Sequence, residues 1–546
     1  MRSFTVALVL VPVVIAACGG GGSGSTPDAS GIPLDASGGM ADTSSPEGSA
    51  SDALLDTSSP ANDAGADTSS DDAPSDATTP PSDAATDAPS DAAIDGGQTP
   101  LVPGGPWRVL AVTSDGVVIY WGPSSPGATS VNIYGVPIAG GSPFVISGPY
   151  TGRFYVSVYG PDVIIWGLVG SSVLGTVSVW TSAHGLIPLA ASSVEDNAWA
   201  SSDGSKILYT ANATSTQKDV YIANSDGSGQ VALVTGAYRT SCPMGAAFVG
   251  TSVIIQHCDA PLPDGGTALP PTLTLFPAGA ANAKADLATL PANNAAYLWS
   301  FDETSALVYA PTNDTPQKGL TFALPAGTST TIDNGGADEG VLVDKGAAVL
   351  YRTTAGALRR SATTSPSPVT LVASGVNGIL GVTPDQSIVL YFGQTASDSQ
   401  GSSLFDLSVA SASTGAAQTH VVPTPNVLTL DVTADSTHLV FGEPSAPNST
   451  IVTMSAVATS APGGTPVGIG TNVAYYRMAT AAKLVLADDY ATATQLVDVH
   501  SVDLSTSTPP QLVAASALGF RLTQDRAKIV YSVEGATPGL YVVPVP

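Results

Sequence analysis

Charged residues are scarce in this chain. Of its 546 residues only 17 are Lys or Arg and 44 are Asp or Glu, so the formal net charge is −27. Phosphate backbones and anionic lipid headgroups repel such a chain. The one basic doublet, Arg359-Arg360, is too small a footprint for a nucleic acid. We therefore expect no nucleic-acid partner.

Residues that bind metals or attack substrates are also scarce. No two histidines stand four residues apart, as they would in a helical metal pair, and no C-x-x-C occurs. The chain has no G-x-S-x-G motif, so a serine hydrolase is not indicated. These absences predict no catalytic residue, no metal site and no cofactor. The five histidines are His184, His257, His420, His438 and His500.

Acidic pairs and Gly-rich turns have simpler interpretations than catalysis. A glycosidase needs two carboxylates about 5–10 Å apart that face each other across the bond. The neighbouring acids Glu195-Asp196 and Asp488-Asp489 diverge along a strand or loop, so we interpret them as solvated. No helix follows Gly227-Ser228-Gly229, and this segment is interpreted as a turn between strands rather than a phosphate loop.

No apolar run at the N-terminus is long enough to cross a bilayer. The run from Val6 to Ala17 covers 12 residues, against about 20 for a membrane span, and Arg2 precedes it. Residues 1–18 therefore predict a signal peptide. Its end, Ile15-Ala16-Ala17-Cys18, resembles a bacterial lipobox, which implies lipidation of the Cys18 thiol. The resemblance implies an exported protein that contacts the membrane only through this anchor, and Gly19 in the next position implies the outer membrane.

Residues 19–97 form an acidic linker. Between Gly19 and Pro100 there are 15 acidic residues and no Lys, Arg or aromatic residue, and short units such as ADTSSP recur. Low hydrophobicity, many prolines and like charges predict disorder. The Asp residues lack the fixed Asp/Asn/Gly spacing of a calcium loop, so a plain spacer is expected.

The texture changes at Trp107, where runs of Val, Ile, Leu and Tyr begin, punctuated by Gly, Asp and Pro. Helical periodicity is nearly absent, with only Ala278 to Ala296 as a candidate, so the fold class is all-β. The clearest unit runs from Trp199 to Val234 and reads WASSDGSKILYT, DVYIANSDGSGQ, VALV. It resembles the blade repeat of TolB-like β-propellers, relatives of WD-repeat proteins. In this unit Asp203-Gly204 is the first hairpin turn, because Gly supplies the positive φ that a tight turn needs.

Ten such units fit between Trp107 and Pro546, with turn markers 41 to 51 residues apart, the size of a four-stranded blade. Ten exceeds the usual four to eight blades, so some units are not blades, or the ring is large, or there are two rings. The last unit ends at its third strand, Leu540 to Val543, while Thr99 to Val102 looks like an outer strand. We predict that this segment closes a single ring, with the propeller domain at residues 98–546 and about 8–10 repeats.

Only two cysteines remain after Cys18. An even pair in an exported chain predicts a disulfide between Cys242 and Cys258, and two free buried thiols are the alternative. His257 precedes Cys258, but neighbours on a strand point to opposite faces, which argues against a catalytic Cys–His pair.

These observations favour a monomeric, non-enzymatic lipoprotein of the cell envelope that acts in recognition or scaffolding. Its partner would be an envelope protein, a peptide or a glycan. The alternative is a carbohydrate-active enzyme, a lyase or glycosidase, built on a propeller. Fold alone does not decide between the two.

Overall fold

The computed structural model describes the backbone of residues 51–53, and residues 99–546 apart from short gaps. Within the described residues the strands form nine antiparallel sheets, so the predicted all-β class is confirmed. The Ala-rich candidate helix begins instead with two 3-10 turns, η1 (Pro277–Gly279) and η2 (Ala281–Ala283). No other helix is described, and neither turn has the length or apolar character of a membrane-spanning helix. The gaps lie at 169–173, 195–197, 202, 215, 239–245, 258–271, 290–296, 303–304, 312–317, 325–327, 334–335, 398–402, 417, 447–448, 492–493, 507 and 535–536.

The described strands make ten four-stranded blades in chain order. Blades 1 to 3 are β3 (Arg108–Val112), β4 (Val117–Pro123), β5 (Val131–Pro137), β6 (Phe144–Tyr150); β7 (Phe154–Tyr159), β8 (Asp162–Leu168), β9 (Leu174–Thr181), β10 (Gly185–Val194); and β11 (Ala198–Ala200), β12 (Lys206–Ala211), β13 (Gln217–Asn224), β14 (Val231–Tyr238). Blades 4 and 5 are β15 (Ala246–Val249), β16 (Ser252–His257), β17 (Thr272–Phe276), β18 (Ala285–Thr289); and β19 (Tyr297–Asp302), β20 (Ser305–Pro311), β21 (Lys318–Ala323), β22 (Ser329–Asp333).

Blades 6 to 8 follow the same order, and blade 7 carries one extra short strand. They are β23 (Ala337–Val343), β24 (Ala348–Thr353), β25 (Leu358–Ala362), β26 (Val369–Val372); β27 (Gly378–Val382), β28 (Ile388–Phe392), β30 (Ser403–Ser411), β31 (Thr419–Val427), with β29 (Thr395–Ser397) paired to β30; and β32 (Thr429–Val432), β33 (His438–Pro444), β34 (Val452–Ala458), β35 (Val467–Val473).

Blades 9 and 10 share one seven-stranded sheet. The long strand β39 (Gln511–Leu522) is the outer strand of blade 9 in its first half and the inner strand of blade 10 in its second half. The other strands are β36 (Tyr475–Met478), β37 (Lys483–Ala491) and β38 (Leu496–Asp503) in blade 9, and β40 (Lys528–Val533), β41 (Gly539–Pro544) and β2 (Val102–Pro103) in blade 10.

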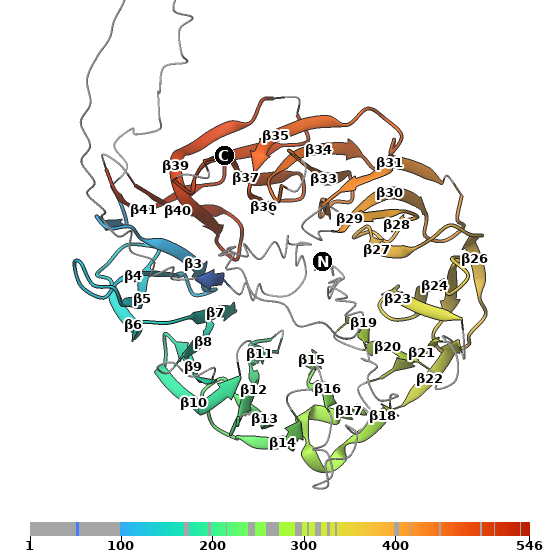
Figure 1. The fold of residues 1–546 in the computed structure, drawn as a ribbon, viewed down its shortest axis with the longest axis horizontal. Coiled ribbons are helices and arrows are strands. Elements are labelled where there is room, and N and C mark those ends of the chain that lie inside the picture. The colour runs from blue at the N-terminus through green and yellow to red at the C-terminus, as the bar shows by residue number, and fades with distance from the viewer. Residues whose placement is uncertain are drawn as a thin grey trace, which may run out of the picture.

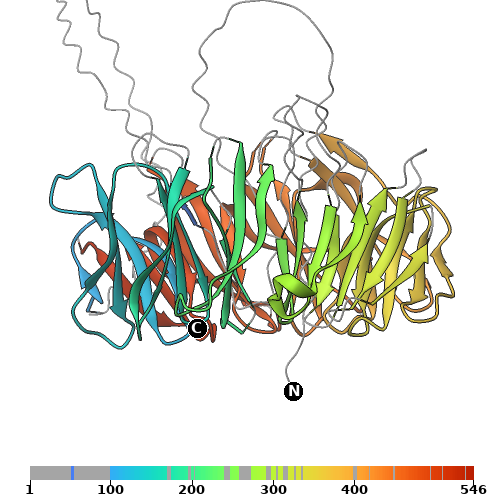
Figure 2. The same cartoon turned by 90° about the horizontal axis from the view of Figure 1, so that it is seen from below.

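The blades form a single ring (Figure 1), and a side view shows a flat disc with strands running between its two faces (Figure 2). The ring closes as the sequence predicts: β2 pairs antiparallel with β41, with Val102 opposite Leu540. The amide of Leu101 donates to the carbonyl of Leu540 at 2.7 Å. The buried side chains of Val102 and Leu540 pack with Tyr120 of blade 1, so closure also joins the first blade to the last.

One short strand falls within the predicted linker. In β1 (Ser51–Ala53), Ser51 lies opposite Val156 and Ala53 opposite Phe154, along the inner edge of β7. An inner strand has one edge without a partner in its own blade, so its backbone groups can accept another strand. The sequence predicts no strand here, and the rest of the linker lies outside the described residues.

The turn from the inner strand to the second strand follows one hydrogen-bond pattern. In blade 3 the hydroxyl of Ser201 donates to Asp203 at 2.6 Å, and Asp203 also accepts the amide of Ser205. The bond from Ser201 lowers the pKa of Asp203. Gly204 has a φ of +68°, which confirms the predicted Asp-Gly turn. Blades 7 and 10 repeat the bond from Thr383 to Asp385 and from Thr523 to Asp525.

The core lies between neighbouring blades, as the nearly continuous apolar second strands indicate. The buried rings of Tyr120 and Tyr209 each stack on a Tyr directly opposite on the third strand. The interpretation of these aromatic residues as core is therefore confirmed. Three blades repeat the stacked pair: Tyr120–Tyr134, Tyr209–Tyr221 and Tyr531–Tyr541.

Candidate interaction surface

Several residues singled out from the sequence lie outside the described residues. They are Cys18, Cys242, Cys258 and the acidic pair Glu195-Asp196. Lipidation of the first cysteine and a disulfide between the other two therefore stay predictions. The described part of the chain contains no group of three His, Cys, Asp or Glu side chains arranged to hold a metal ion.

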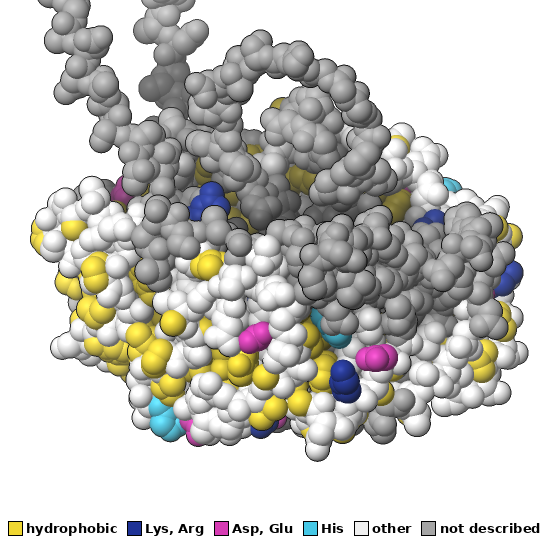
Figure 3. All heavy atoms as spheres, turned by 60° about the horizontal axis from the view of Figure 1, so that its bottom comes forward, with side chains coloured by type: hydrophobic (Ala, Val, Ile, Leu, Met, Phe, Trp, Pro, Cys, Tyr) yellow, Lys and Arg dark blue, Asp and Glu magenta, His cyan; other side chains and the backbone are white. Residues whose placement is uncertain are grey.

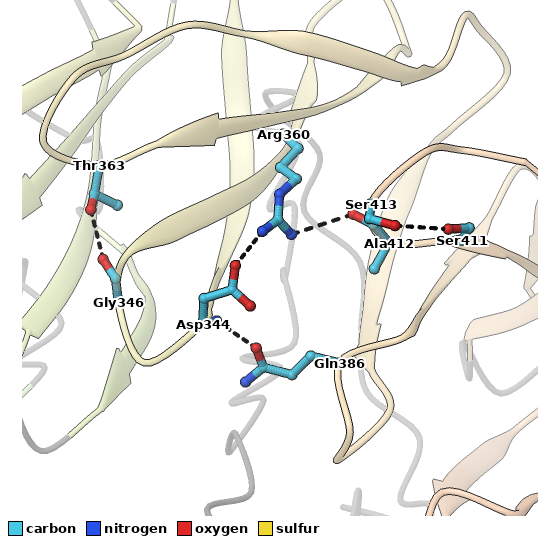
Figure 4. A network of polar contacts seen from close by, with 8 residues as sticks. All are labelled: Asp344, Gly346, Arg360, Thr363, Gln386, Ser411, Ala412 and Ser413. Atoms are coloured by element: carbon cyan, nitrogen blue, oxygen red, sulfur yellow. Dashed lines mark hydrogen bonds and ion pairs between the residues drawn. The ribbon is translucent and has the colours of Figure 1, made fainter.

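The basic doublet has a structural role on the side of Arg360, which lies between blades 6 and 7 (Figure 4). Its guanidinium pairs with the carboxylate of Asp344 and donates to the carbonyl of Ala412 at 3.4 Å. The amide of Asp344 donates to the side chain of Gln386 in the next blade. Arg360 is thus held within the ring by neighbouring turns.

The titratable groups with raised pKa values lie in three different blades. Burial raises the pKa of Asp162 in blade 2 to about 6 and that of Asp431 in blade 8 to about 7. In blade 9 the Nδ1 of His500 lies 2.7 Å from Asp488, and this hydrogen bond raises the pKa of the histidine. Burial also raises the pKa of the adjacent Asp489. Because these groups belong to separate blades, they do not form the facing carboxylate pair that glycoside cleavage needs.

The most distinctive surface feature is a set of exposed apolar side chains at the beginning of the outer strands. On three consecutive blades these are Phe144 and Val145 of β6, Leu186 of β10 and Val231 of β14, with exposed fractions of 37%, 56%, 41% and 42%. We call these four residues the rim patch. Figure 3 shows hydrophobic side chains gathered on the outer wall of the ring, with few charged ones among them.

Packing contacts connect the rim patch from blade to blade. The ring of Phe144 lies 5.8 Å from that of the buried Trp180 in blade 2, and Trp180 is the register partner of Leu186. Next to Leu186, Ile187 approaches the turn of blade 3 so closely that a Cβ at Gly227 would lie 2.6 Å from its methyl group. The apolar surface therefore continues across both blade boundaries rather than consisting of separate side chains.

The chain around the rim patch carries almost no charge. No Asp, Glu, Lys or Arg occurs in residues 116–152 or in residues 163–194, which supply most of blades 1 and 2. Large exposed side chains elsewhere stand alone, such as Val369 on blade 6 and Val467 on blade 8. A contiguous exposed apolar surface in a protein is typical of a binding site, whereas single exposed apolar residues are normal.

The outer strands that carry the rim patch are shaped against strand addition. In blades 1 to 9, every pairing of the third strand with the outer strand contains a register shift. β-Bulges twist an edge away from a straight partner and so block pairing with another chain. A partner would therefore bind the rim patch by side-chain packing and not by extending a blade.

Sequence reasoning missed the rim patch for a physical reason. Val, Leu and Phe in a strand predict burial, and the outer strand of a blade has the same residue types as the buried ones. The absence of charge in residues 116–152 was the signal that could have located it.

Comparison with known proteins supports no family assignment. No family model matches the chain, and no curated protein matches its sequence. Among solved structures it is similar to the tricorn protease, at 10% identity and a TM-score of 0.29, over 79% of this chain and 56% of that chain. It is also similar to dipeptidyl peptidase 4 of Porphyromonas gingivalis, at 11% identity and a TM-score of 0.42, over 78% of this chain and 68% of that one. The β-propeller domain of the Trilobed protease from Pyrococcus furiosus matches at 10% identity and a TM-score of 0.28, over 57% of this chain and 97% of that chain. At these identities the comparisons concern the fold alone.

Proposed function

We propose that this protein is a recognition or scaffolding propeller of the cell envelope, which binds the apolar face of a protein partner through the rim patch. The observation that carries the proposal is the contiguous exposed surface of Phe144, Val145, Leu186 and Val231 on chain segments without charge. Burying such side chains in an interface is favourable by about 25 cal/mol per Å² of apolar surface.

The chemistry of the rim patch favours a protein over the other partner classes. Three of its four side chains are aliphatic, whereas glycan recognition relies on exposed aromatic faces and directed hydrogen bonds. An uncharged surface offers nothing to a charged polymer, and the body of the protein beyond the linker and signal keeps a net charge of about −13. Side-chain packing against a neutral apolar face is the interaction that remains.

Anchoring completes the proposal. Lipid on Cys18 and the linker of residues 19–97 would hold the propeller at the envelope while allowing it to reach a partner, since a flexible chain of this length has a mean reach of about 50 Å. Cys18→Ala should abolish incorporation of a palmitate analogue and release the protein in soluble or unprocessed form. Label retained in the variant would contradict the anchor.

Photocrosslinking in intact cells tests the binding surface. A photoreactive phenylalanine replaces Val145 in the full-length protein, and the same residue replaces Val369 in the control, because both valines are exposed on outer strands at 56% and 57%. We expect a protein adduct of defined mass from position 145 and none from position 369. Equal adducts from both positions, or none from 145, would overturn the proposal. Binding of neutral polysaccharides by the wild type, lost in Leu186→Lys, would replace the protein partner with a glycan.

A further inference from the structure

A group of buried polar atoms without partners lies between the inner strands of blades 8 and 9. Alternation along β32 turns Leu430 toward blade 7, so Thr429 and Asp431 face blade 9. Opposite them, Tyr476 of β36 packs into the core shared with blade 8. Asp431 and Tyr476 are 8% and 7% exposed. The three side chains therefore meet in the gap between the two inner strands.

The hydrogen bonds of this group are incomplete. One carboxylate oxygen of Asp431 accepts the amide of Val432 at 2.7 Å. The other oxygen of Asp431, the hydroxyl of Thr429 and the phenol of Tyr476 have no hydrogen-bond partner among the described residues. Buried polar atoms without partners are rare in folded proteins, and each one calls for a physical explanation. A proton on Asp431 supplies one, because the carboxylic acid can then donate to an oxygen on Tyr476 or Thr429.

The charges around Asp431 come from three elements. β36 contributes Tyr476 and Arg477, and the turn after β39 contributes Arg526, whose positive charges favour the ionised carboxylate. On its own blade, β33 places the apolar Val440 opposite Asp431. Burial outweighs the two arginines and raises the pKa of Asp431 to about 7, while burial also raises the pKa of Tyr476, so the phenol keeps its proton.

We propose that Asp431 is a proton-dependent latch that holds the inner strands of blades 8 and 9 together. In the protonated form it donates to the oxygens facing it, and the gap stays closed. In the ionised form the carboxylate needs water or an arginine, and the gap must open to admit either. The inference is independent of the rim patch, which lies on other blades.

The direction of the effect follows from linkage. A carboxyl group whose pKa is raised in the closed state binds its proton more tightly there than in the open state. Closure is therefore strongest near the ordinary pKa of Asp and weakens as the pH rises toward about 7, where the weakening levels off. Within that window the open population should grow by at most about tenfold per pH unit.

Hydrogen–deuterium exchange of the full-length protein tests the latch. Exchange rates of peptides covering β32 and β36, corrected for intrinsic rates, are compared at about pH 5 and about pH 7.5. We expect faster exchange at the higher pH in the wild type, and no pH dependence in Asp431→Asn, which cannot ionise. Asp435→Asn is the control, because Asp435 lies in an exposed turn of the same blade and its pKa is lowered, outside the window. It should behave as the wild type.

Two results would overturn the proposal. One is equal protection of β32 and β36 at both pH values in the wild type, and the other is an unchanged pH dependence in Asp431→Asn. If that variant fails to fold, infrared difference spectra of the wild type between the same pH values decide. A protonated buried carboxyl that titrates near neutral pH supports the latch, and its absence refutes it.

Discussion

The strand that closes the ring gives a sharp test of the architecture. Val102 is 5% exposed and packs between blades 10 and 1. Val102→Ala removes two buried methyl groups, at about 0.8 kcal/mol each, and leaves a small cavity, so a loss of about 2 kcal/mol is expected. For a domain of this size that corresponds to a decrease of about 2–4 °C in the melting temperature. Val369→Ala is the matched control, because Val369 is an exposed valine on the outer strand of blade 6 and should change stability by less than about 0.5 kcal/mol.

Truncation extends the same test from the side chain to the strand. A chain that starts at residue 91 should melt at the temperature of the full chain, whereas one that starts at residue 103 loses Val102 and the bond from Leu101 to Leu540. Differential scanning calorimetry measures both pairs. Equal melting temperatures for Val102→Ala and Val369→Ala, or for the two truncated chains, would refute closure by this strand.

Three further predictions concern single sites. Ser436 has a φ of +61° and accepts the amide of the preceding blade's turn at 2.9 Å, so Ser436→Ala should cost about 1 kcal/mol and Ser436→Gly less, in urea unfolding; equal losses would contradict this. His500→Gln should cost about 2 kcal/mol near pH 5.5 and less near pH 9, because the raised pKa of His500 keeps its charged bond to Asp488 at low pH and that stability is lost as the pH rises through it; pH-independent losses would count against the pair. Peptide mapping without reductant should find Cys242 joined to Cys258, and free thiols in the exported protein would exclude the bond.

The blade architecture could be predicted because each unit repeats local signals. The Asp-Gly turn at Asp203-Gly204 and the apolar second strand after it need only a few neighbouring residues, and the same pattern marks most blades. Ring closure was predictable for a similar reason, since a missing fourth strand after Val543 and a spare strand before Trp107 are both visible in the chain.

What the sequence could not show depends on contacts between blades. Ser436 and Gln386 occupy turn positions where blades 1 and 3 have Gly, and only the structure shows that each side chain binds the turn of the preceding blade. Asp431 in the segment TLDV is an unremarkable strand residue until Tyr476 is placed against it from a different blade. The rim patch likewise requires knowledge of which strand is outermost in each blade.

The most direct test of the proposed function is the affinity of the crosslinked partner for three forms of the full-length protein. Leu186→Lys places a charge in the middle of the rim patch, and Val467→Lys places the same charge on an isolated exposed valine of blade 8. Titration calorimetry with the purified partner should show at least about a tenfold weaker affinity for Leu186→Lys, equivalent to about 1.4 kcal/mol, and wild-type affinity for Val467→Lys. Wild-type affinity for Leu186→Lys, or equal losses in both variants, would contradict recognition through the rim patch.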